Sequence, residues 1–352
     1  MSGLLQSDAT VVVLGQSDAQ SVYARGYFGT LTADRLTLDR FEAVYLSEMG
    51  RLQVEEDGGA IEWPEVFRRA TRFEPEFGVR YIVYRDLRQR GYVVRKSSPQ
   101  AAFSVLPRGG VLHKTPARFW IEPYSERTPF DLARVLELAD RSQTAKKSLL
   151  LALVDEESDL TYYRVRRPTP TGSLAARPLS PPATGWLSED RVVVFDGPGV
   201  ETLGGELGFG SKIGSRLEVS LLEATYLAST GQLIIRDTRS RRVVALKRLL
   251  ARARRLEEDF DERSEAYRTL RERHLVVKTG FKYGAHFRAY PRRPEHAHAR
   301  YLVQAVRSDY TTAWPEIAGA VRVAQGVRKE LLVASVTPGG AVRFLALERV
   351  RP

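Results

Sequence analysis

Short stretches with alternating hydrophobic and polar positions recur along the chain, and stretches with helical spacing lie between them. The openings VVVLG (residues 11–15) and RVVVFDG (residues 191–197) predict strands. The stretches RYLVQAV, LLVASV and VRFLALERV near the C-terminal end have the same alternation, and VVKTGFKYGAHFRAY is also predicted as strand. The EAVYL and EATYL stretches predict amphipathic helices.

Charged stretches with helical spacing supply the remaining helices. They are WPEVFRRATRF (63–73), LKRLLARARRLEEDFDERSEAYRTLRERH (246–274) and EIAGAVRVAQGVRK (316–329). Helices and strands therefore alternate in a mixed order, which predicts an α+β or mixed α/β class.

The pattern repeats itself at a distance of about half the chain. Residues 28–54 and 209–235 align without gaps at an offset of 181, with ten of the twenty-seven positions identical. YRDLRQRGYVV (84–94) matches YRTLRERHLVV (267–277) at an offset of 183, and AKKSLLLALV matches VRKELLVASV at 182. We infer one ancestral unit that is present twice, since self-similarity at a fixed period marks a repeat architecture.

Between the two copies lies a stretch rich in Pro, Ser, Thr and Gly that has no hydrophobic period, so we interpret it as a linker. Each copy is expected to contain a small helix-plus-sheet N-terminal subdomain, followed by a mixed-sheet, nuclease-like C-terminal subdomain. The predicted boundaries are 1–92 and 93–166 for the first copy, 167–187 for the linker, and 188–275 and 276–352 for the second copy.

Composition narrows the class of protein. The chain has 54 Lys and Arg against 43 Asp and Glu, a formal net charge of +11, which favours polyanionic partners such as RNA, DNA or an anionic membrane surface. It contains no cysteine, so disulfides and thiolate metal sites are excluded. No apolar run is long enough to span a membrane, and the N-terminus lacks the features of a signal peptide. We expect a soluble, cytoplasmic protein.

Three motifs in the second copy carry the candidate chemistry. They read GFKYGAHFRAY (280–290), HARYLV (298–303) and AVRVAQGVRKELL (320–332). Their order and spacing resemble the catalytic half of the archaeal tRNA-splicing endonucleases. With the duplication, the resemblance covers nearly the whole chain and suggests the form of the enzyme that has two repeats in one chain and assembles as a homodimer.

The resemblance implies an active site made of Tyr290, His298 and Lys329. Members of the family cut precursor tRNA at both exon–intron junctions in a bulge–helix–bulge motif. They use the neighbouring 2′-hydroxyl as the nucleophile and no metal or cofactor, and they leave a 2′,3′-cyclic phosphate and a 5′-hydroxyl. The sequence departs from the family at Gln325 and Gly326, where a His and a Ser are usual, and in the short Tyr290–His298 loop.

These residue types fit that reaction. A histidine such as His298 suits a general acid, because free imidazole exchanges a proton near neutral pH, and Lys329 can place positive charge against the phosphorane. As a general base, Tyr290 would need nearby cations, because a free phenol has a pKa of about 10. Lys329 and the neighbouring Arg292 and Arg293 are candidates. The nearby His296 is an alternative to His298, and the HAH sequence is also compatible with a weak metal site.

The first copy lacks two of the three residues. Leu106 stands where the second copy has Tyr290, Pro116 stands in place of His298, and the third position retains a lysine, Lys147. We therefore expect the first copy to keep the fold without the chemistry. The resemblance implies that a non-catalytic unit docks an acidic loop into a catalytic unit, and the matching stretch, 121–131, carries Glu122, Glu126 and Asp131.

The resemblance also implies a pair of arginines that sandwich a bulge base. Arg322 matches the first, and Arg343 is the candidate for the second. Two other functions compete with the splicing endonuclease. One is a non-catalytic RNA-binding or scaffold subunit that kept the fold. The other is a metal-dependent DNA nuclease, which predicts a cluster of carboxylates near Lys329, where the sequence has only Glu330.

Overall fold

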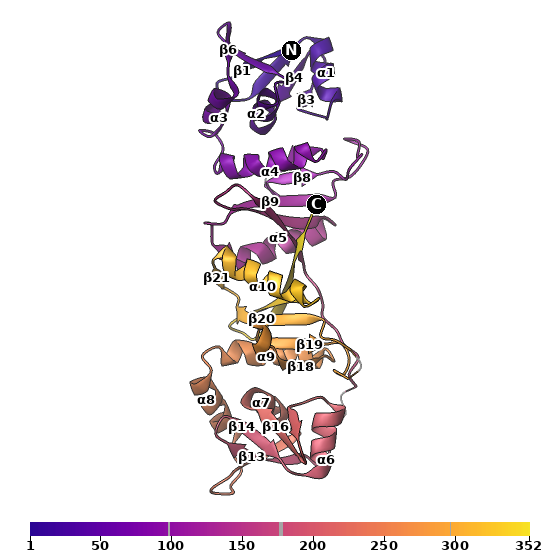
Figure 1. Cartoon of the computed structure of the whole chain (residues 1–352), viewed down its shortest axis with the longest axis vertical. Coiled ribbons are helices and arrows are strands. Elements are labelled where there is room, and N and C mark those ends of the chain that lie inside the picture. The colour runs from indigo at the N-terminus through magenta and orange to yellow at the C-terminus, as the bar shows by residue number, and fades with distance from the viewer. Residues whose placement is uncertain (98, 176–178, 296) are drawn as a thin grey trace. The chain divides into compact units, whose positions relative to one another are not determined.

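The computed structural model of the chain describes residues 1–352 except 98, 176–178 and 296. It divides into two compact units (Figure 1). Unit 1 contains Met1–Thr128, Leu138–Arg164 and Val350–Pro352, and unit 2 contains Pro129–Glu137 and Val165–Arg349. Each unit holds one copy of the repeat apart from short exchanged segments, and each has helices and mixed sheets. The expected α+β class with two repeats, each of two subdomains, is confirmed.

Unit 1 begins with a sheet in the order β3-β4-β2-β1-β5-β6, with helices α1 to α3 in the same part of the chain. β1 pairs in parallel with β5 and antiparallel with β2. The bounds are β1 Ser2–Leu5, β2 Val11–Leu14, α1 Gln16–Ala24, β3 Thr30–Leu31, β4 Arg35–Leu38, α2 Arg40–Glu48, β5 Gln53–Glu56, β6 Gly59–Ile61 and α3 Trp63–Ala70.

The second half of unit 1 continues the same hydrophobic core. β9 and β11 pair in parallel along seven residues, with β8 antiparallel to β9. β11 reads SLLLALV and is almost entirely buried, as expected for a central parallel strand. The bounds are α4 Phe77–Gln89, β7 Val94–Lys96, β8 Phe103–Val105, β9 Phe119–Ser125, α5 Leu132–Thr144 (whose first residues belong to unit 2), β11 Ser148–Val154 and β12 Leu160–Arg166.

Unit 2 repeats this plan. Its first sheet has the order β15-β16-β14-β13-β17, again with a parallel pair, β13 with β17, beside an antiparallel one. The bounds are β13 Ala183–Ser188, β14 Arg191–Val194, α6 Gly197–Gly199, the π-helix η1 Val200–Glu206, β15 Ser211–Ile213, β16 Arg216–Ser220, α7 Leu221–Ser229, β17 Leu233–Asp237 and α8 Leu246–Leu256. β13 thus begins inside the predicted linker.

The second half of unit 2 holds the candidate site. β20 and β22 pair in parallel, β19 is antiparallel to β20, and β18 is antiparallel to β19. The bounds are α9 Phe260–Glu272, β18 Val276–Thr279, the 3-10 helix η2 Phe281–Tyr283, β19 Phe287–Tyr290, β20 Tyr301–Arg307, β21 Thr311–Thr312, α10 Trp314–Gly326, β22 Glu330–Val336 and β23 Val342–Val350, with β10 Phe130–Asp131 pairing with β21.

Two predicted elements need correction. The helical stretch 246–274 is two helices, α8 and α9, because the chain leaves the helix at Glu257, whose φ and ψ are −134° and 113°. The helix 316–329 is α10, Trp314–Gly326, and it ends before Lys329 because Arg328 adopts a left-handed φ of 55°. Of the described residues, no helix combines the length and apolarity that a membrane span requires.

Two kinds of interaction recur at equivalent positions in the two copies, a helix capping box and a cation–π contact. α2 begins with a capping box of Asp39 and Glu42, and α7 begins with one of Ser220 and Glu223. In unit 1 the guanidinium of Arg88 lies 3.7 Å from the centre of the Phe28 ring, and in unit 2 Arg271 lies 3.9 Å from that of Phe209.

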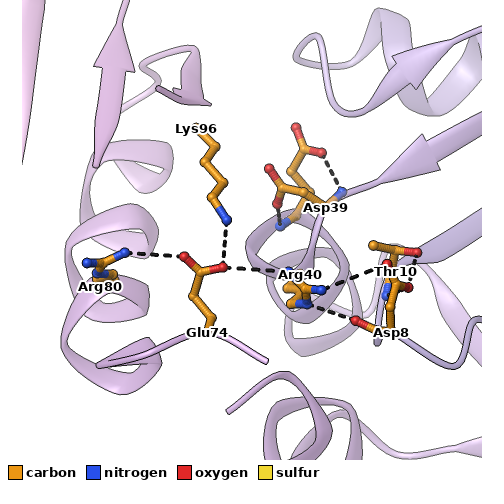
Figure 2. Close-up of polar contacts among 8 residues, drawn as sticks. Asp8, Thr10, Asp39, Arg40, Glu74, Arg80 and Lys96 are labelled. Carbon is orange, nitrogen blue, oxygen red and sulfur yellow. Dashed lines mark hydrogen bonds and ion pairs between the residues drawn. The ribbon is translucent and has the colours of Figure 1, made fainter. Parts of the chain in front are cut away.

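A buried carboxylate, Glu74, joins the two halves of unit 1. It forms ion pairs with Arg80, Lys96 and Arg40, and Arg40 also approaches Asp8 (Figure 2). The side chain of Glu74 is 7% exposed, so its three cationic partners replace the water that it loses on folding.

Candidate active site

The residues predicted for catalysis lie at the same end of three neighbouring strands in unit 2. Tyr290 is the last residue of β19, His298 lies in the loop that leads to β20, and Lys329 immediately precedes β22. Backbone hydrogen bonds fix this register: Arg300 N donates to Ala289 O at 3.0 Å, and Glu330 N donates to Arg300 O at 2.9 Å. Tyr290 and Lys329 are thus separated by two strand spacings, about 10 Å between backbones.

Lys329 is presented by a tight turn at the end of α10. Its backbone N donates to Ala324 O at 2.8 Å, which closes the turn through the left-handed Arg328. Its Nζ donates to Val327 O at 3.0 Å and lies 5.6 Å from the centre of the Tyr283 ring. The ammonium group is therefore held at the strand ends and half-buried, where it can meet an anionic phosphate.

Arg288 is a cation at this site that the sequence argument missed. Its guanidinium carbon lies 5.8 Å from the ring centres of both Tyr290 and Tyr283, and its Nε donates to Thr279 O at 2.8 Å. Arg288 and Tyr290 are two residues apart on β19, so their side chains share one face of the sheet, and that period could have revealed the pair. In the part of the chain that the structure describes, the predicted cations Arg292 and Arg293 make no cation–π contact with Tyr290, whereas Arg288 does.

His298 is exposed, and the residue that follows it packs beside Tyr290. Its neighbour Ala299 is buried in a small cluster with Tyr290, Val276 and Leu174. The alternative His296 lies outside the described residues, so the structure adds nothing to the choice between the two histidines.

Residues 171–174 of the predicted linker form a strap along the ends of β18 and β19. Gly172 N donates to Arg273 O at 2.9 Å, Ser173 N to Pro291 O at 2.8 Å, and Leu174 N to His274 O at 3.0 Å. A Cβ on Gly172 would lie 2.2 Å from His274 O, so only glycine fits there. Leu174 and Tyr290 are buried in the same small hydrophobic cluster. The Pro- and Ser-rich composition gave no signal for this role, because the strap is held mainly by backbone atoms.

The structure spreads the predicted acidic loop over three elements. Glu122 lies on β9, is buried, and accepts a hydrogen bond from Ala102 N at 2.9 Å. Glu126 lies in the turn after β9, and Asp131 lies on β10, where it accepts from Arg134 N at 3.1 Å. The predicted loop 121–131 is therefore strand in its first part, because FWIEPYS is buried along six of its seven residues, as expected for a strand covered on both faces.

The two predicted RNA-binding arginines lie on different elements. Arg322 is exposed on α10, two turns before Lys329. Arg343 is exposed on β23 and pairs in register with Ser335, which lies six residues beyond Lys329 along β22, about 20 Å away. Arg343 therefore lies at the opposite end of the sheet from the three strand-end residues of the same chain.

Comparison with known proteins agrees with the twofold pattern. The family model described as "tRNA intron endonuclease, catalytic C-terminal domain" matches residues 77–162 and 260–344. The model described as "tRNA intron endonuclease, N-terminal domain" matches residues 1–67 and 183–250. Both domains are therefore present twice.

Relatives align over nearly their whole length. The chain is 35% identical to a tRNA-splicing endonuclease of Methanosarcina acetivorans over 351 residues, 98% of this chain and 99% of the relative. It is 36% identical to that of Methanosarcina mazei, with 97% and 96% covered, and 34% identical to that of Natronomonas pharaonis, with 97% and 98% covered.

Proposed function

Because this chain belongs to the tRNA intron endonuclease family, whose models match both of its copies, we propose that it cleaves precursor tRNA at both exon–intron junctions in a bulge–helix–bulge motif. The enzyme is an endonuclease. In the proposed reaction the 2′-hydroxyl attacks the adjacent phosphorus and the 5′-oxygen leaves, without a metal ion. The products are a 2′,3′-cyclic phosphate and a 5′-hydroxyl.

The observation that supports this reaction is the convergence of Tyr290, His298 and Lys329 at one end of β19, β20 and β22. We assign His298 as the general acid for the leaving 5′-oxygen, since it is exposed and can reach a bound substrate. Lys329 balances the negative charge that develops on the phosphorane. Tyr290 accepts the proton of the 2′-hydroxyl, and the guanidinium of Arg288 lies 5.8 Å from the centre of its ring.

The same proposal gives the first copy a structural role. Leu106 and Pro116 cannot transfer protons, so the first copy contributes assembly and not chemistry. We propose a homodimer in which two second copies face the two cleavage points. Of the acidic residues, Glu126 is the candidate for docking, since Glu122 is buried within unit 1 and Asp131 caps α5.

We also propose that Arg322 contacts the bulge, with Arg343 as the second arginine. Because Arg343 lies at the opposite end of β22 from Lys329 in one chain, a shared grip on one base would need the second protomer. Substituting each arginine by alanine in a bulge-cleavage assay tests the pair. Equal losses would support a shared grip, and an unchanged Arg343→Ala variant would remove Arg343 from it.

One cleavage experiment tests the function. The protein is incubated with a bulge–helix–bulge RNA in excess EDTA, beside the His298→Ala and Lys329→Ala variants. We expect cleavage by the parent, cyclic phosphate ends, and strong losses in both variants. If the parent does not cut, the chain is a binding or scaffold subunit. If EDTA abolishes cutting, the metal-independent mechanism is wrong.

A further inference from the structure

The segment from Arg236 to Leu256 carries most of the excess positive charge of the chain. It reads RDTRSRRVVALKRLLARARRL and contains nine Arg or Lys and one acidic residue, Asp237. It includes the end of β17, the turn that follows, and α8 (Figure 1). The net charge of this segment is +8 and that of the whole chain is +11, so most of the excess positive charge lies on one segment of unit 2.

α8 presents this charge on one side. At 100° per residue, Lys247, Arg248, Arg252, Arg254 and Arg255 fall within one half of the helix circumference. Leu249 and Ala253 occupy the other half and are buried in the core of unit 2. The cationic half of the helix therefore faces solvent.

The turn before α8 extends the same charged strip. Arg239, Arg241 and Arg242 are exposed. The one acidic residue of the segment, Asp237, stabilises this turn, since it accepts hydrogen bonds from Ser240 N at 2.7 Å and Arg239 N at 3.1 Å. The turn and α8 together form what we call the basic strip, Arg236–Arg255.

Little of this charge is neutralised by the protein itself. Arg254 pairs with Asp261 at 2.8 Å, and Arg252 donates to the backbone oxygen of Glu189 at 2.7 Å. In the part of the chain that the structure describes, Arg254 is the one cation of the strip with a carboxylate within 4.0 Å. Several exposed cations in one strip repel each other, so a bound polyanion would relieve that repulsion.

The equivalent segment of the first copy is acidic instead. Residues 53–73 hold five acidic residues and three arginines, and their helix is α3. Arg68 pairs with Glu65 at 2.7 Å, and Arg69 pairs with both Glu65 and Glu56. The basic strip is therefore a property of the second copy and not of the repeated fold.

We infer that the basic strip binds the sugar–phosphate backbone of structured RNA, outside the strand-end site. Its arginines and its one lysine are suited to phosphates and carry no sequence information, so the strip would bind the body of a precursor and not the bases at the cleavage points. An anionic membrane is the less favoured partner, because a helix that lies on a membrane needs a free apolar face, and Leu249 and Ala253 are packed inside.

This inference rests on the proposed function, and binding and cleavage are therefore measured separately. The probe is a bulge–helix–bulge precursor tRNA with 2′-deoxyribose at both cleavage points, which removes the nucleophile and leaves the phosphates. Its Kd is measured over a range of salt concentrations with the full-length protein and with the triple variant Lys247→Ala, Arg248→Ala, Arg255→Ala. Cleavage of the all-ribose RNA is followed in parallel.

We expect the triple variant to bind about tenfold more weakly near physiological salt, and the slope of log K against log salt to fall by about two to three. The matched control is Arg68→Ala, Arg69→Ala, Arg72→Ala on α3 and the turn that follows it, which removes the same charge from the acidic equivalent and should leave the slope unchanged. At saturating RNA, the rate of cutting by the strip variant should equal that of the parent.

The outcomes are distinct. An unchanged Kd and salt slope in the strip variant, with normal cutting by the parent, would overturn the strip and leave the proposed function standing. Equal losses in the strip and α3 variants would show a general effect of net charge and would also overturn it. A parent that binds RNA through the strip without cutting would remove the proposed function only. Strip-dependent binding to phosphatidylserine vesicles, with RNA binding unchanged, would assign the strip to membranes.

Discussion

In both copies, the helix of the second subdomain (α5 or α10) ends in a turn with one residue of left-handed φ. The next residue is a lysine at the start of a parallel strand. In the first copy, Lys147 N donates to Ser142 O at 2.8 Å and follows Lys146, whose φ is 55°. In the second copy, Lys329 N donates to Ala324 O at 2.8 Å and follows Arg328, whose φ is also 55°. The side chains differ. Lys147 Nζ donates to Ala117 O at 2.7 Å, whereas Lys329 Nζ donates to Val327 O at 3.0 Å and lies over the Tyr283 ring. The same backbone turn therefore presents a lysine in each copy, but the surroundings of its ammonium group differ.

The copies also differ where their two halves meet. In unit 1, Glu74 holds Arg40, Arg80 and Lys96 together (Figure 2). In unit 2 the equivalent positions are Glu257, Leu221, Arg263 and Thr279, and all four line a cavity of about 560 Å³.

Two cations of the first network are thus replaced in the second copy by shorter or uncharged side chains. Glu257 keeps one partner of the same kind, Arg263, at 2.8 Å. The comparison shows that the first copy gathers three cations on one buried carboxylate, whereas the second copy spreads its ion pairs over Glu257, Arg263, Asp259 and His286.

The strongest test exchanges the two lysines for alanine in turn. We expect Lys329→Ala to lower the rate of cutting at saturating RNA by about 100-fold or more, because the charge opposite the phosphorane is lost. Lys147→Ala should leave that rate unchanged, since Lys147 is held by Ala117 O. Single-turnover cleavage measures both. Equal losses would contradict the division of labour between the copies.

The ion network is tested by truncating its carboxylate. We expect Glu74→Ala to lower the free energy of unfolding of unit 1 by about 2–4 kcal/mol, because three cations lose their shared, buried partner. Glu257→Ala, whose carboxylate is 32% exposed, should cost about 1 kcal/mol. Urea unfolding followed by fluorescence gives both values. A larger loss in Glu257→Ala would mean that the second copy is the braced one.

The strap is tested at the position where only glycine fits. Gly172→Ala should push residues 171–174 away from His274 O and loosen the packing of Leu174 on Tyr290. We expect cutting to slow by about tenfold, since a misplacement of about 1 Å is costly at a reacting group. Gly197→Ala, where an added Cβ meets nothing within 4 Å, is the control. Leu174→Ala should slow cutting in the same way, and Leu174→Met should restore it.

The smallest expected effect concerns the capping boxes. Burial, and next the nearby Asp39, raise the pKa of Glu42 from 4.5 to about 8, although Arg95 opposes the shift. A carboxyl with a raised pKa stabilises the fold below pH 4.5, and that contribution is lost as the pH rises through about 8.

Asp39→Ser copies the box of the second copy, where Ser220 stands, and removes the neighbouring negative charge. The variant should therefore lose less stability than the parent between about pH 5 and about pH 9. Thermal unfolding across that range measures the difference. Parallel curves for the two proteins would show that Asp39 does not act on Glu42.

Parts of the fold and the site were predictable because they depend on local pattern. The strand alternation in RYLVQAV and LLVASV predicted β20 and β22, and the three motifs indicated Tyr290, His298 and Lys329 as candidate catalytic residues. The end of α10 was not predictable, since it depends on Arg328 adopting a left-handed φ that carries no glycine signal. Glu122 was misplaced because an acidic residue was taken for a loop residue, whereas a backbone N–H satisfies it inside a sheet.

The sequence by itself determined the duplication, the fold class and the loss of Tyr290 and His298 from the first copy, because these are properties of residue identity and spacing. The tertiary structure was needed to show that Leu174 packs in one buried cluster with Tyr290, that Arg288 lies beside the Tyr290 ring, and that Glu74 gathers three partners. Those contacts join residues far apart in the chain through backbone atoms and side-chain directions. No periodicity encodes such contacts, so only the folded register brings them together.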